Sequence, residues 1–159
     1  MSGRGISRTC RRLCSRRRGD RMARRIPLIA LQRAIYKRLT ECQDVPVYDA
    51  VPDDVNARYD LPCITFGAFT YKPDGTKQDD VAHVTLQLDV WSAESGRAEV
   101  QQITNDIALL IEHSRLTLDD EFEVVRQEID FFEAFAEDPS GYHGVITLAA
   151  DVLNTKKEE

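Results

Sequence analysis

The chain has 159 residues, a length typical of one domain, and its 42% hydrophobic and 30% charged residues are ordinary for a globular protein. The formal charge of −6 combines two opposite parts: residues 1–25 hold ten arginines and one acid, whereas the rest holds 11 basic and 26 acidic residues, or −15. A body that acidic makes a poor DNA-binding surface, and no stretch approaches the roughly 18–20 apolar residues of a membrane span.

Residues 1–25 have no apolar periodicity, so we expect a disordered Arg-rich head. Three interpretations compete: a nucleic-acid tail, a targeting peptide, or sequence upstream of the true start. We favour the third, with Met22 as the start, because the helical pattern begins directly after it. At the other end, residues 155–159 are expected to fray.

The body begins with a predicted helix over residues 28–42, followed by a short strand in "PVYDAVPDD". The next run, "LPCITFGAFTY", predicts a strand with Ile64 and Phe66 on one face. Cys63, Thr65 and Phe69 should lie on the other face. Gly67 indicates a bulge or the close approach of another backbone.

"HVTLQLDVW" alternates as in a sheet with one covered face, so residues 85, 87 and 89 should point outward. A second helix is predicted from about Ser95 to His113. "FEVVRQEIDFFEAF" is strand-like with a phase slip near Val124 and Val125, and "YHGVITLAADVL" is a closing strand. The pattern predicts one α+β domain over residues 26–154, with a mostly antiparallel or mixed sheet and two helices packed on one face.

The junction "LDVWSAESGRAEV" (88–100) has the strand–turn–helix order of phosphate sites and nucleophile turns. A phosphate cradle needs several glycines, and a nucleophile turn needs glycine on both sides of the serine. Only Gly96 is present, so we expect Ser92 or Ser95 to cap the helix instead. Trp91 is either at the edge of the core or an anchor for a partner.

Other chemistry is weaker. Acidic clusters occur at residues 53–54, 79–80 and 119–121, and we interpret them as solvated loops rather than metal sites. The four cysteines have no partners at metal-ligand spacing. His143 between two turn glycines is expected to be structural. We therefore predict no catalytic residue, cofactor or metal. The alternative of another class is a small cytosolic hydrolase that uses Ser95 and His143.

Five segments, in this order, resemble the tail-completion family of long-tailed phages and prophages, which is similar in role to lambda-type tail terminators. They cover about residues 28–153 and read "LQRAIYKRL", "VYDAVPDD", "LPCITFG", "HVTLQLDVWSAESGRAEV" and "DPSGYHGVITL". The most characteristic part is Trp91-Ser92 followed by Gly96-Arg97 and a helix, whereas the Arg-rich head has no counterpart.

The resemblance implies a structural virion protein, assembled in the bacterial host cytoplasm, that caps the tail tube at its head-proximal end. It would form a ring, commonly of six subunits, and contact the major tail tube protein and the head–tail connector or neck proteins. DNA would pass through only as cargo, and no membrane is implied. A head-side neck adaptor is the alternative within this class. Candidate contact residues are Lys72, Asp74, Lys77, Trp91, Arg97, Asp138, Tyr142 and His143.

Overall fold

The computed structural model describes residues 25–50, 61–75, 79–119, 121–136 and 141–155. Residues 1–24, including the expected start at Met22, lie outside this part. At the ends of the described chain, Arg25 contacts the carboxylate of Glu121, and the backbone N–H of Thr155 donates to the carbonyl of Glu121 at 2.9 Å.

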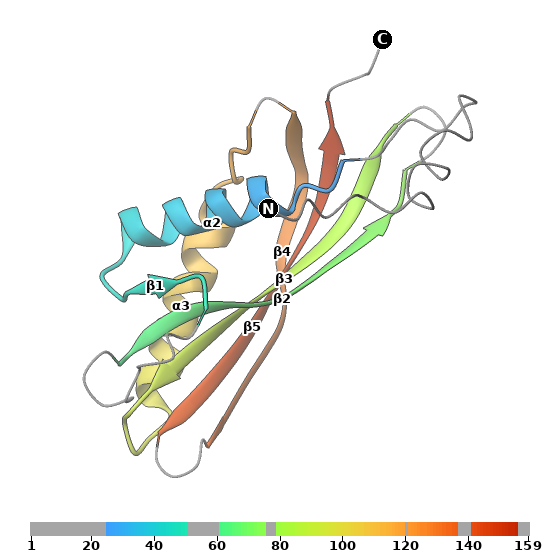
Figure 1. The fold of residues 1–159 in the computed structure, drawn as a ribbon. Coiled ribbons are helices and arrows are strands. Elements are labelled where there is room, and N and C mark those ends of the chain that lie inside the picture. The colour runs from blue at the N-terminus through green and yellow to red at the C-terminus, as the bar shows by residue number, and fades with distance from the viewer. Residues whose placement is uncertain (1–24, 51–60, 76–78, 120, 137–140, 156–159) are drawn as a thin grey trace, which may run out of the picture.

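The described residues form two helices and a five-stranded sheet in the order β1-β2-β3-β5-β4 (Figure 1). The elements are α2 (Leu28–Cys42), β1 (Val47–Tyr48), β2 (Cys63–Pro73), β3 (Val81–Ser92), α3 (Ala98–His113), β4 (Phe122–Ala136) and β5 (Tyr142–Asn154). All neighbouring strands are antiparallel except β1 and β2. The predicted α+β domain with a mostly antiparallel sheet is confirmed.

Both helices pack on the same face of the sheet and enclose the core (Figure 1). Alternation in β3 supplies this face with Val84, Leu86, Leu88 and Val90, all 2% exposed or less. Leu31 and Ile35 of α2 and Ile107 of α3 cover them, at 1% exposed or less. The period-two pattern predicted β3 correctly because only one face of the sheet is covered.

β2 contains the irregularity that Gly67 suggested: its register with β3 shifts between Phe66 and Phe69. The extra residue reverses the alternation, so Phe69 pairs with Leu86 and faces the helices. The expectation that Phe69 shares a face with Cys63 and Thr65 was therefore wrong. Gly67 also allows a close approach, since a Cβ there would lie 2.4 Å from Asp89 Oδ2.

β4 shows the predicted phase slip, with a register shift against β5 between Val124 and Arg126. Val125 lies in the shift and is exposed. A second shift, between Ile129 and Phe131, was not predicted. Together the two shifts let a long edge strand follow the twisted sheet.

Helix α3 begins at Ala98 rather than near Ser95, and its N-cap residue, Arg97, makes no side-chain capping bond. The prediction that Ser92 or Ser95 caps this helix was wrong. The Ser92 hydroxyl instead accepts a hydrogen bond from the backbone N–H of Glu94 at 3.1 Å and contacts the carboxylate of Glu99. Ser92 therefore stabilises the turn before the helix, and its contact with Glu99 links this turn to the first turn of α3.

Candidate functional site

Three ring side chains form a line across β3, β5 and β4 on the sheet face opposite the helices. Trp91 pairs in register with His143, which pairs with Phe135. The indole stacks on the imidazole with ring centroids 3.9 Å apart and an interplanar angle of 12°. Phe135 meets the same imidazole edge-on at 4.8 Å. We call Trp91, His143 and Phe135 the aromatic row.

Hydrogen bonds beneath the aromatic row hold its members in place. His143 Nε2 lies 2.9 Å from Asp89 Oδ1, and the side-chain amide of Gln87 donates to the same oxygen at 2.8 Å. Trp91 Nε1 donates to the Thr65 hydroxyl at 3.0 Å. The side chains of His143 and Asp89 are only 13% and 10% exposed. Buried hydrogen bonds of this kind fix side-chain positions, so the row is rigid.

A cation–π contact lies at the same end of the strands, on the helix face of the sheet. The Arg97 guanidinium lies 5.9 Å from the ring centroid of Tyr142, the residue next to His143. Four of the predicted contact residues thus lie at one end of the strands: Trp91 and His143 on the open face, and Arg97 and Tyr142 on the helix face. We call this group the corner.

Two other predicted contact residues lie at the opposite ends of β2 and β3. Lys72 pairs in register with His83, and the backbone N–H of Asp74 donates to the carbonyl of Val81 at 3.0 Å. Both side chains are exposed near the β2–β3 hairpin. Lys77 and Asp138 lie outside the described residues.

The hydrolase alternative requires contact between Ser95 and His143. Ser95 is exposed in the turn before α3. Within the described ranges, no hydrogen bond joins these two residues, and His143 Nε2 faces Asp89. The geometry therefore offers no support for a serine nucleophile activated by His143.

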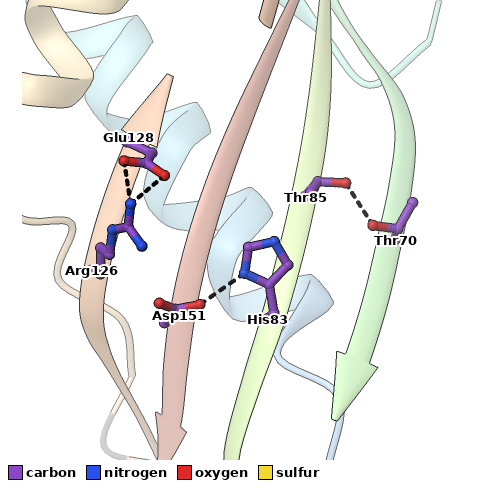
Figure 2. A network of polar contacts seen from close by, with 6 residues as sticks. All are labelled: Thr70, His83, Thr85, Arg126, Glu128 and Asp151. Atoms are coloured by element: carbon purple, nitrogen blue, oxygen red, sulfur yellow. Dashed lines mark hydrogen bonds and ion pairs between the residues drawn. The ribbon is translucent and has the colours of Figure 1, made fainter. Parts of the chain in front are cut away.

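Polar contacts cover the open face nearer the hairpin (Figure 2). His83 Nδ1 lies 2.8 Å from Asp151 Oδ1, and the hydroxyls of Thr70 and Thr85 are 2.6 Å apart. Arg126 donates to both carboxylate oxygens of Glu128 at 2.7 Å. The hydrogen bond and the charge of Glu128 raise the pKa of the Arg126 guanidinium above its ordinary value. These contacts join neighbouring strands or residues within one strand.

Exposed apolar side chains gather at two places that the sequence did not predict. Those on and just before α2 are Ile26, Ile29 and Tyr36, and those on β4 are Val125, Phe131, Phe132 and Phe135. The helix residues border a surface hollow that is lined by Ile29, Gln32, Arg33, Tyr36, Asp49 and Phe66. Clusters of this kind on a small domain mark contact surfaces.

In the part of the chain that the structure describes, no helix is long and apolar enough to cross a membrane. Within the same residues, no group of three or more His, Cys, Asp or Glu side chains is placed to hold a metal ion.

Comparison with known proteins identifies the family. The sequence model described as "Tail completion protein gp17" matches residues 33–152, which is more than half of the chain. No curated protein matches the chain.

Solved structures with a similar fold include a chain of the "Virion of native gene transfer agent (GTA) particle". Its TM-score is 0.69 at 19% identity, over 80% of this chain and 97% of that one. The "Structure of bacteriophage SPP1 gp17 protein" is also similar, with a TM-score of 0.49 at 20% identity over 82% of this chain and 92% of that one. The match over residues 33–152 shows that the chain belongs to the tail completion protein gp17 family and is a structural, tail-completion protein of the virion.

Proposed function

We propose that this protein stops the growth of the tail tube by capping it as a ring of identical subunits, commonly six. The ring would lie at the head-proximal end of the tail and provide the surface to which the head is joined. The subunit would act through assembly alone, without catalysis. Assembly would take place in the cytoplasm of the bacterial host.

The observation that carries this proposal is that the sheet ends in two different edges. One edge is the long strand β4, and the other is formed by β2 with the two-residue strand β1. Open strand edges favour pairing with other chains, and two unlike surfaces on one subunit give head-to-tail contacts, which form a ring when the rotation between subunits closes.

The ends of the strands would then form the two faces of the ring. Lys72 and Asp74, near the β2–β3 hairpin, lie at one end of β3. The corner with Trp91 and His143 lies at the other end. We propose that one end contacts the major tail tube protein and the other contacts the head–tail connector or neck proteins.

The charge of the body fits a ring around passing DNA. Residues 26–159 carry a formal charge of −15. An acidic channel wall repels phosphates and lets DNA slide without being held. DNA would therefore be cargo rather than a bound partner.

Electron microscopy of particles made with and without this protein tests the proposal. We expect overlong tails of variable length, without heads, when the protein is absent. Tails of normal length that fail to attach heads would instead favour the neck adaptor. Normal tails attached to heads would refute both functions.

A further inference from the structure

Two surfaces on opposite edges of the sheet carry most of the exposed apolar side chains. We call the first the β4 patch; it consists of Asp130, Phe131, Phe132, Glu133 and Phe135, all exposed along this edge strand. Phe132 pairs with Ile146 on the helix face, whereas Phe131 and Phe135 pair with Thr147 and His143 on the open face. The second is the α2 hollow, lined by Ile29, Gln32, Arg33, Tyr36, Asp49 and Phe66. Exposed aromatic groups are costly in water, so each surface favours a partner.

The charges of the two surfaces are complementary. The β4 patch carries Asp130 and Glu133, whereas Arg33 lines the α2 hollow and the exposed Lys37 follows one turn further along α2. In the described part of the chain, none of these four side chains forms an ion pair. Asp49, the acid of the hollow, contacts the side-chain amide of Gln32. An acidic aromatic surface attracts a basic apolar one, whereas two acidic or two basic surfaces would repel each other.

The two surfaces also lie at the same level of the sheet. Phe66 in the hollow pairs with Leu88, which pairs with Ile146, which in turn pairs with Phe132 in the patch. A neighbour docked from edge to edge would therefore not be displaced along the strands. A head-to-tail contact without such a displacement does not rise into a helix, and it forms a ring when the rotation between subunits closes.

The β4 patch is supported by the rigid part of the molecule. Phe135 packs on His143, whose position is fixed by Trp91 and Asp89. An aromatic side chain that is held in place before binding loses little conformational entropy on contact, which is the property of an interface anchor.

We propose that the β4 patch of one subunit occupies the α2 hollow of the next, with Phe131, Phe132 or Phe135 against Tyr36 and Phe66 and with Glu133 facing Arg33 or Lys37. The occupant is a second copy of this chain, because each surface complements the other and the two lie on opposite edges of the same sheet. This inference rests on the proposed ring and assigns the surfaces that close it.

Cysteine cross-linking in assembled virions tests the contact directly. The chain carries Glu133→Cys and Lys37→Cys, with Cys10, Cys14 and Cys42 replaced by serine; Cys63 is retained because it is buried. A short bis-maleimide should yield a ladder of covalent multimers that ends at the closed ring. The two single-cysteine chains are matched controls and should yield none. A protein that is present in the virion but gives no ladder would overturn this inference and leave the ring proposal standing.

Charge reversal provides the second arm. Glu133→Lys or Lys37→Glu alone should reduce the number of copies per particle about tenfold, because like charges would meet. Both reversals in one chain should restore it, as should mixing the two single variants. Glu112→Lys, the same charge change on the exposed surface of α3, should have no effect. Thermal unfolding midpoints would establish that every variant is folded.

Absence of rescue in the double variant, with all chains folded, would contradict the assigned pairing. By contrast, if particles made without the protein had the same tails as wild-type particles, the proposed function itself would be refuted. The two failures are therefore distinguishable.

Discussion

His143 acquires its surroundings from distant parts of the chain. The sequence predicted a structural histidine beside a tight turn, but its partners Asp89 and Trp91 are more than fifty residues away. The same contacts explain why Asp89, predicted to point outward, is only 7% exposed although it faces away from the helices. Register between non-consecutive strands creates this cluster, and local periodicity carries no information about it.

Gly67 is predicted to be intolerant of even one added methyl group. In Gly67→Ala, the new Cβ would meet Asp89 Oδ2 at 2.4 Å and Gln87 Nε2 at 2.9 Å. Because both side chains are held in the network beneath the aromatic row, we expect a loss of about 1–3 kcal/mol in the free energy of unfolding. Urea unfolding followed by circular dichroism measures it. Gly96→Ala is the matched control, since nothing lies within 4 Å of its Cβ position; equal midpoints for the two variants would contradict the prediction.

Trp91 should show two separable contributions to stability. Trp91→Phe keeps an aromatic ring against His143 but removes the hydrogen bond to the hydroxyl of Thr65. Thr65 is buried, with only 2% of its surface exposed. We expect a loss of about 1 kcal/mol for this variant and about 3 kcal/mol for Trp91→Ala, which also loses the stacked ring. Urea unfolding monitored by circular dichroism is suitable because the fluorescence of the only tryptophan is lost. Two variants as stable as the wild type would show that the row does not support the fold.

At the scale of elements, the sequence predicted what depends on local pattern. Helix α2, strand β3 and the slip in β4 follow from periodicity, because one face of each element is covered. The position of β5 between β3 and β4 depends on pairing between distant segments and was not predicted. The start of α3 was missed because Ser92 stabilises the turn rather than the helix end. The exposed β4 patch was missed because it lies in a strand whose alternation is interrupted twice.

Helix α3 should depend on a glycine of β5 for its distance from the sheet. A Cβ at Gly144 would lie 2.5 Å from Cγ1 of Val100, a fully buried side chain of α3. Gly144→Ala should therefore cost about 1–3 kcal/mol. Val100→Ala alone should also destabilise by leaving a cavity, but the double variant should lose less than the sum of the two. Denaturant unfolding of the four proteins gives this coupling energy. Strict additivity would show that the two residues do not limit the approach of the helix.

At the scale of the whole molecule, the proposed ring gives the edges and the ends of the sheet separate uses. The edges carry the β4 patch and the α2 hollow, which we assign to neighbouring subunits. The ends of the strands carry the β2–β3 hairpin and the corner. In Figure 1, β2 and β3 run past the helices toward their hairpin. In the proposed ring, a subunit built this way would present one end of its sheet to each side.

Substitutions near the hairpin should therefore separate subunit association from attachment. The exposed side chains of Lys72 and Asp74 lie near the hairpin end of β2, six or more residues from Phe66, the residue of β2 that lines the α2 hollow. In the chain that carries both Lys72→Ala and Asp74→Ala, we expect the cross-link ladder between positions 37 and 133 to persist. The ring should fail to attach either to the tail tube or to the neck proteins, because that contact would lose both charges.

Electron microscopy identifies the side. Overlong tails would place the hairpin against the tube, whereas tails of normal length without heads would place it against the neck. Normal tails attached to heads would contradict a contact role for the hairpin. Loss of the ladder itself would contradict the separation of edges from ends, because the hairpin would then be needed for the subunits to meet.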